Sequence, residues 1–125
     1  MRLLLIDDHA AFLDALESIL GQVPDLEVVG RAEDGRQGLR AAAELKPDLV
    51  LVDFSMPELD GIGVIRELKT WSSPPKIVML SLHTGAELRD AALQAGADAF
   101  LCKTDLYLEL LPLLEGFGSG AGEIR

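Results

Sequence analysis

Five short apolar runs alternate with stretches of helical spacing, and this alternation restricts the fold more than any other feature of the sequence. Each run is continuous rather than alternating, as expected of strands that are covered on both faces of a parallel sheet. The runs are RLLLI (2–6), LEVVG (26–30), DLVLV (48–52), KIVML (76–80) and AFLC (99–102). We therefore predict an α/β fold with a five-stranded parallel sheet and helices on both of its faces.

The stretches between the runs have the spacing and the end signals of helices. Apolar residues form one stripe from Phe12 to Leu20, and Gly21 is a suitable stop just beyond it. Asp34 is placed to cap a second helix, which must end before Pro47. Three later helices are expected around Ile62–Leu68, around Leu88–Ala95 and from Thr104 onward.

The C-terminal part of the chain carries two further signals. Pro112 lies about two turns into the last predicted helix, where it has no N–H to donate, and it predicts a kink or an early end near Leu111. From residue 118 on, the segment GSGAGEIR has the composition of a linker. We expect one domain over residues 1–117 and a flexible tail or the start of a linker over residues 118–125.

Charge and composition argue against several classes of function. The formal net charge is -10, and the 11 basic residues are scattered, which disfavours direct binding to nucleic acid or to an anionic membrane. The excess of carboxylates favours cationic partners instead, such as a metal ion. Cys102 is the only cysteine, which excludes an internal disulfide. No apolar run approaches the roughly 20 residues of a membrane span, so we expect a cytoplasmic protein.

Polar residues follow four of the predicted strands. Asp7 and Asp8 follow the first, Asp53 the third, Ser81 the fourth and Lys103 the fifth. In open parallel sheets, ligands bind at the carboxyl ends of the strands, so these groups are expected to meet. Three close carboxylates raise one another's pKa, and a hard divalent cation such as Mg²⁺ removes that conflict. A carboxylate is also a nucleophile toward phosphorus, which predicts phosphoryl transfer to one of these acids.

The residues at these strand ends resemble those of the receiver domain of two-component response regulators. The matching segments are IDD (6–8), DFSMP (53–57) with DG (60–61), MLS (79–81) and AGADAFLCK (95–103), and the likeness extends from residue 1 to about 115. The resemblance implies a flavodoxin-like (βα)5 fold with strand order 2-1-3-4-5, and it makes residues 1–117 the receiver domain. IDDHAAF, DGRQGL and AGADAFLCKTD are most similar to the NarL/FixJ (LuxR-type) branch.

The resemblance assigns the chemistry to particular residues. Asp53 becomes the phosphoacceptor, and Lys103 takes the position of the family's lysine. Mg²⁺ or Mn²⁺ is expected on Asp8, Asp53 and the backbone carbonyl of Ser55, with Asp7 acting through water. These residues together imply an aspartyl phosphate that forms with the help of a bound metal.

The resemblance also implies a conformational switch. Ser81 takes the position of the switch hydroxyl, and Phe100 that of the aromatic side chain that moves inward on activation. Ser55 and His83 occupy positions that tune the loss of the phosphoryl group. In contrast to many family members, Lys103 is followed by threonine rather than proline, and Ser81 is followed by a bulky leucine.

Other residues have simpler interpretations. His9 is expected to be a surface or capping residue, and we assign it no catalytic role. Cys102 is expected to be a small buried apolar residue, and Trp71 to cover apolar surface in a loop.

The function implied is a phosphorylation-dependent signalling switch rather than a conventional enzyme. A sensor histidine kinase is the expected phosphodonor, and a homodimer is the expected product of activation. The surface of the fourth helix, fifth strand and fifth helix would then control transcription through a helix-turn-helix domain not present in this chain, so that DNA is contacted only through that domain and no membrane is involved.

Three alternatives stay open at this point. A stand-alone receiver that acts by protein contact would carry the same residues. A small Mg²⁺-dependent phosphatase of the haloacid dehalogenase type is less favoured, because its first strand ends in D-x-D and here Asp7 and Asp8 are adjacent. A flavodoxin-like FMN protein needs a Ser/Thr/Gly-rich loop after the first strand to hold phosphate, and DDHA would repel phosphate.

Overall fold

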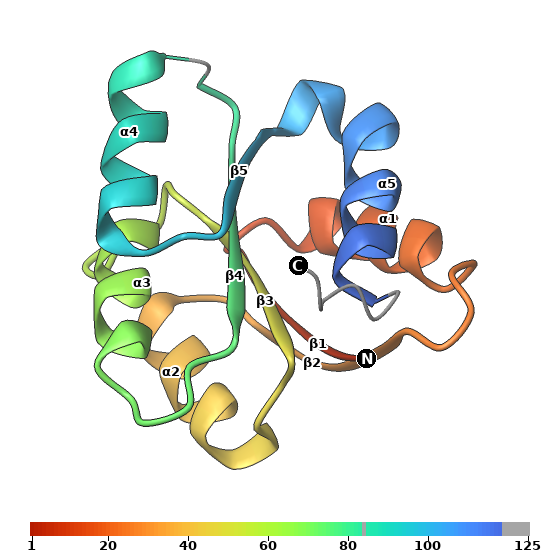
Figure 1. Cartoon of the computed structure of the whole chain (residues 1–125), viewed down its shortest axis with the longest axis horizontal. Helices are drawn as coiled ribbons and strands as arrows, with labels where there is room; N and C mark the ends of the chain where they lie inside the picture. The colour runs from red at the N-terminus through yellow and green to blue at the C-terminus, as the bar shows by residue number, and fades with distance from the viewer. Residues whose placement is uncertain (84, 119–125) are drawn as a thin grey trace.

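The computed structural model describes residues 1–83 and 85–118, which form one parallel sheet between two layers of helices (Figure 1). The strands lie in the order β2-β1-β3-β4-β5 and all neighbours pair in parallel, which confirms the predicted fold class and strand order. The strands are β1 (Arg2–Ile6), β2 (Glu27–Ala32), β3 (Leu49–Asp53), β4 (Lys76–Ser81) and β5 (Ala99–Cys102).

Helices cover both faces of the sheet, as Figure 1 shows. Helices α1 (Ala10–Leu20) and α5 (Leu106–Gly118) lie on the first face. The opposite face carries α2 (Gly35–Leu45), α3 (Gly61–Lys69) and α4 (Ala86–Ala95). A short 3₁₀ turn, η1 (Lys103–Asp105), connects β5 to α5. No helix among the described residues is long and apolar enough to cross a membrane.

The sheet separates two apolar cores because neighbouring residues of a strand point to opposite faces. In β3, Leu49 and Leu51 pack with α1 and α5, whereas Val50 and Val52 pack with α2, α3 and α4. The same alternation holds in β1 and β4. Nearly all of these residues are fully buried, which explains why the runs read as continuous apolar segments.

Two helices begin at an aspartate cap, of which Asp34 was predicted, and a third ends at a glycine. Asp34 caps α2, its side chain accepting a hydrogen bond from the backbone N–H of Gln37 at 2.8 Å. Asp60 caps α3 in the same way, from the N–H of Gly63 at 2.9 Å. Gly96 ends α4 with a φ of 120°, a backbone conformation that suits glycine.

The C-terminal helix differs from the prediction at both ends. It begins at Leu106 rather than Thr104, because η1 takes up the first turn. The predicted early end near Leu111 is wrong: α5 continues to residue 118 with Pro112 inside it. Pro112 faces solvent, and the buried side chains of Leu110 and Leu114 anchor the helix on either side of it. Of the expected tail, residue 118 ends α5, and residues 119–125 lie outside the described part of the chain.

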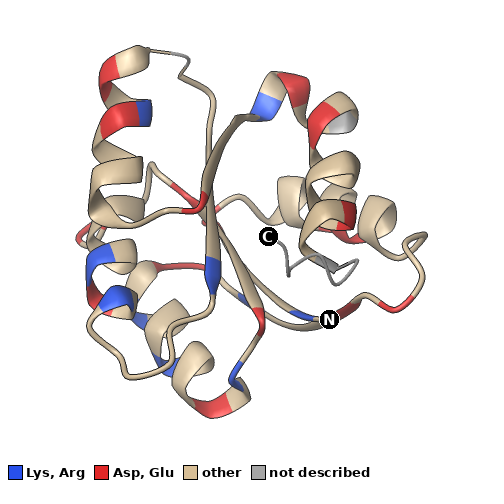
Figure 2. Ribbon diagram, viewed as in Figure 1, with Lys and Arg blue, Asp and Glu red and all other residues tan. Residues whose placement is uncertain are grey.

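Charged residues are spread over the elements of the fold. In the view of Figure 2, Lys and Arg appear on several helices and strand ends and form no continuous stripe. This distribution agrees with the scattering of basic residues along the sequence.

Candidate functional site

The central strands bring the predicted site residues to one edge of the sheet. Asp7 directly follows β1, Asp53 is the last residue of β3, and Ser81 is the last residue of β4. These three side chains are buried, with relative exposures of 2%, 3% and 2%. They are the only buried polar or charged residues recorded for the described chain, so the polar interior is confined to this edge.

Lys103 reaches this edge from the end of β5 and pairs with two of the buried acids. Its ammonium nitrogen Nζ lies 2.7 Å from Oδ2 of Asp7 and 3.1 Å from Oδ1 of Asp53. The lysine side chain is itself only 7% exposed. Nζ also lies over the ring of Phe12 from α1, 4.1 Å from its centroid, in a cation–π arrangement. The bond between Lys103 and Thr104 is trans.

Asp53 has one engaged oxygen and one free oxygen. Oδ1 contacts Lys103, whereas the buried Oδ2 has no hydrogen-bond partner among the described residues. Burial, and then the negative charge of Asp7, raise the pKa of the Asp53 carboxyl, and the neighbouring Lys103 opposes that rise. An unpartnered buried carboxylate oxygen is costly, and a cation or a bonding partner at this position would remove the cost.

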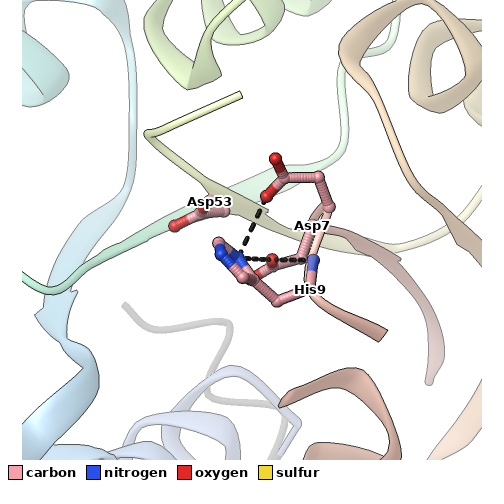
Figure 3. A group of neighbouring side chains, drawn as sticks. Asp7, His9 and Asp53 are labelled. Atoms are coloured by element: carbon pink, nitrogen blue, oxygen red, sulfur yellow. Dashed lines mark hydrogen bonds and ion pairs between the residues drawn. The ribbon is translucent and has the colours of Figure 1, made fainter. Parts of the chain in front are cut away.

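His9 joins the acidic residues, which sequence reasoning did not anticipate. Its Nδ1 lies 3.1 Å from Oδ1 of Asp7 and 3.0 Å from Oδ1 of Asp8. Figure 3 shows the His9 ring beside the carboxylates of Asp7 and Asp53. The backbone N–H of His9 also donates to Oδ1 of Asp7 at 2.8 Å. The only sequence signal was the position of His9 directly behind the acidic pair.

The four side chains form a donor set that suits a divalent cation. One ligand atom from each of Asp7, Asp8, His9 and Asp53 lies within 4.8 Å of all the others. An octahedral ion with ligands at about 2.1 Å separates opposite ligands by about 4.2 Å, so these donors need only small movements to bind one ion. Three of the four donors are carboxylates, the ligand type that Mg²⁺ prefers.

The loop after β3 is fixed close to Asp53. The backbone N–H of Phe54 donates to the carbonyl of Leu80, and that of Gly61 donates to the carbonyl of Phe54, both at 2.9 Å. A Cβ atom on Gly61 would lie 2.6 Å from the carbonyl oxygen of Asp53, so only glycine permits this approach. Ser55 lies in this loop and is exposed.

The predicted switch residues lie beside the acidic edge. Ser81 Oγ accepts a hydrogen bond from the backbone N–H of His83 at 2.9 Å. Leu82 is 66% exposed, and His83 is exposed as well. Phe100 is half-buried, pairs in register with Met79 of β4, and packs against the core on the α2–α4 face. Ser81 thus lies at the end of β4, and Phe100 lies on the face of the sheet that carries α4.

A comparison with protein families matches residues 3–111 to a family described as the response regulator receiver domain. The transcriptional regulatory protein LiaR of Bacillus subtilis is 36% identical over 125 residues, which cover 100% of this chain and 59% of LiaR. The nitrate/nitrite response regulator protein NarL of Escherichia coli K12 is 36% identical over 118 residues, 94% of this chain and 55% of NarL. The chain thus spans somewhat more than half the length of these two relatives.

Solved structures agree with this match. A LuxR-family response regulator from Aurantimonas superposes with a TM-score of 0.89 at 28% identity, over 95% of this chain and 85% of that chain. The receiver domain of the NarL-type regulator from Mycobacterium tuberculosis gives a TM-score of 0.82 at 30% identity, over 92% of this chain and 96% of that chain. The fold described above is therefore shared with known structures.

Proposed function

The chain belongs to the response regulator receiver domain family and has relatives in the LuxR/NarL branch, and from this premise we propose that it is a signalling switch that accepts a phosphoryl group on Asp53. One observation carries the proposal. Asp53 places a buried carboxylate at the end of β3, with Oδ1 held by Lys103 and Oδ2 without a partner among the described residues. A nucleophilic oxygen with no competing hydrogen bond is suited to attack phosphorus.

The proposed donor is a phosphohistidine on a sensor histidine kinase. Oδ2 of Asp53 forms a new bond to phosphorus while the bond from phosphorus to the donor imidazole breaks. The departing imidazole nitrogen keeps the electron pair of that bond and takes up a proton. Lys103 lies 3.1 Å from Asp53 and stabilises negative charge on the acceptor and on the phosphoryl oxygens.

The acidic residues supply the expected metal site. We assign Mg²⁺ or Mn²⁺ to Asp8, Asp53 and the backbone carbonyl of Ser55, with Asp7 acting through water. When bound, the metal neutralises charge on the carboxylates and on the incoming phosphoryl group. The raised pKa of Asp53 supports this assignment, because burial and then the charge of Asp7 disfavour its ionised carboxylate, which a nearby cation would stabilise.

Phosphorylation then changes the hydrogen bonding of the β4 end. In the unphosphorylated chain, Oγ of Ser81 accepts a hydrogen bond from the backbone N–H of His83. The hydroxyl hydrogen of Ser81 can therefore be donated to a phosphoryl oxygen on Asp53. A movement of Ser81 draws the following loop inward, and Phe100 fills the space on the α4 side of the sheet. In this scheme Ser55 and His83, both exposed beside the site, tune the attack of water on the aspartyl phosphate.

The altered surface of α4, β5 and α5 is the proposed output. LiaR is named as a transcriptional regulatory protein, and this chain covers 59% of its length. We assign the output to transcription through a DNA-binding domain outside this chain, with a homodimer forming on activation. A second candidate is an enzymatic output, because a protein-glutamate methylesterase/protein-glutamine glutaminase of Myxococcus xanthus is 44% identical over 93% of this chain and 34% of that protein.

Incubation with phosphoramidate and Mg²⁺ tests the proposal, with intact mass as the measurement. We expect the wild-type chain to gain the mass of one phosphoryl group and the Asp53→Ala variant to gain none. Asp90→Ala, a change on the exposed side of α4, serves as a control that keeps full labelling. Stoichiometric phosphate on Asp53→Ala, or none on the wild-type chain, would refute the assignment.

A further inference from the structure

His9 holds the imidazole closest to the acidic residues, and its place there is not explained by helix capping. The residue occupies the N-cap position of α1, yet its side chain makes no capping hydrogen bond. The chain has two histidines, and the second, His83, is outside the cluster of donors. The ring of His9 instead points its Nδ1 at Asp7 and Asp8, at 3.1 and 3.0 Å.

Asp7 does not need the ring to satisfy its oxygens. Its Oδ1 accepts the backbone N–H of His9 at 2.8 Å, and its Oδ2 accepts from Lys103 at 2.7 Å. The imidazole nitrogen is therefore available as an additional metal ligand at a site that already holds three carboxylates. A second feature points to a ligand at this edge of the sheet: Asp53 is only 3% exposed, and its Oδ2 has no hydrogen-bond partner among the described residues.

A nitrogen ligand changes which ions such a site prefers. Mg²⁺ takes oxygen ligands almost exclusively, whereas imidazole suits Co²⁺, Ni²⁺ and Zn²⁺. We propose that His9 adds a nitrogen ligand to the Asp7–Asp8–Asp53 site and makes that site bind borderline transition-metal dications more tightly than Mg²⁺. The inference shares the acidic residues of the proposed function and rests on it for the presence of a metal site, but it requires no phosphoryl transfer.

The arrangement explains why a single imidazole suffices for the preference. One atom from each of the four side chains lies within 4.8 Å of the others, so one ion can contact the ring together with Asp8 and Asp53 while Asp7 acts through water. The ring is 61% exposed and lies on the loop between β1 and α1, so it can move by the small distance that coordination requires. A bound ion would take the place of the contacts that Nδ1 makes with Asp7 and Asp8.

Calorimetric titration of the metal-free chain with Co²⁺ and separately with Mg²⁺ tests this inference. The variants are His9→Ala, His9→Asn, which keeps a good N-cap residue for α1, and the matched control His83→Ala. We expect the wild-type chain and His83→Ala to bind Co²⁺ more tightly than Mg²⁺. Both His9 variants should lose roughly tenfold or more in Co²⁺ affinity, the scale on which metal sites respond to loss of a supporting group, with Mg²⁺ affinity unchanged or higher.

The visible absorption spectrum of bound Co²⁺ gives a second readout that does not depend on affinity. We expect the bands of the wild-type complex to differ from those of the His9→Asn complex and to match those of His83→Ala. An unchanged spectrum, an unchanged Co²⁺ affinity, or equal losses for Co²⁺ and Mg²⁺ would each overturn the role of His9.

The outcomes separate this inference from the proposed function. If the wild-type chain binds Mg²⁺ and is labelled on Asp53, but Co²⁺ binding does not depend on His9, only the inference is overturned. A different result would be tight Co²⁺ binding that depends on His9, together with stoichiometric phosphate on the Asp53→Ala variant. That result supports the inference and refutes the phosphoacceptor assignment. If the wild-type chain binds neither Co²⁺ nor Mg²⁺, the metal site is refuted in the proposed function and in the inference alike.

Discussion

Lys103 and Asp7 are 96 residues apart in the chain, and their side chains meet at 2.7 Å in the interior. The same ammonium group lies 3.1 Å from Asp53, so one lysine is shared by two buried carboxylates. With Asp8 beside them, the site carries more negative than positive charge. That imbalance is the physical basis of its expected affinity for cations and of the predictions that follow.

Replacing Lys103 with methionine is expected to destabilise the fold in metal-free buffer. The change leaves Asp7 and Asp53 buried without their cation, and breaking a buried ion pair in this way costs about 3–5 kcal/mol. Urea unfolding in the presence of a chelator measures the loss, and added Mg²⁺ should restore part of it. As a control, Arg36→Met removes an exposed ion pair with Glu58 and should change stability little. An equally stable Lys103→Met chain would contradict the shared-lysine account.

Asp53→Asn is expected to be more stable than the wild-type chain at neutral pH without metal. Burial and the charge of Asp7 raise the pKa of Asp53 above its ordinary value of 3.8, so the folded chain binds this proton more tightly than the unfolded chain. The free energy of unfolding therefore falls as the pH rises through the raised pKa. Below 3.8 the carboxyl is protonated in both states and the penalty is absent.

Chemical unfolding of both chains across a pH series measures this effect. The stability advantage of Asp53→Asn should shrink as the pH falls through the raised pKa toward 3.8. Asp90→Asn, on the exposed side of α4, is the matched control and should show no comparable advantage. A less stable Asp53→Asn chain at neutral pH would show that the carboxylate is fully compensated.

Gly61→Ala is expected to lower both stability and the rate of labelling by phosphoramidate. The new Cβ would lie 2.6 Å from the carbonyl oxygen of Asp53 and 2.9 Å from Cα of Phe54, so backbone must shift at a cost of about 1–3 kcal/mol. Gly116→Ala is the control, since its new Cβ would meet nothing within 4 Å beyond the adjoining backbone of its own helix, and alanine favours the helix by about 0.5–1 kcal/mol. Thermal unfolding should show changes of opposite sign for the two variants.

The fold class was predictable because its signals are local and repeated, whereas the strand order came from the resemblance to receiver domains. Each strand that is buried on both faces reads as a continuous apolar run, and each helix between them carries a periodic stripe. The early end predicted near Leu111 was wrong, because the exposed position of Pro112 and the anchoring by Leu110 and Leu114 are tertiary facts that no local rule contains.

The candidate site was predictable in part. Asp7, Asp53, Ser81 and Lys103 stand at strand ends, and parallel topology brings such ends together without further information. The ring of His9 at the acidic pair and the ring of Phe12 under the lysine were not predicted. Both depend on side-chain rotamers at the start of α1, which residue spacing does not specify.

The division of the interior by the sheet has a consequence for how such a chain can change over time. The core behind α1 and α5 and the core behind α2, α3 and α4 share no buried side chain, since alternate residues of each strand serve opposite faces. Substitutions without shared contacts combine nearly additively. Natural variation or deliberate engineering can therefore rebuild one helical layer for a new partner while the opposite layer keeps its sequence.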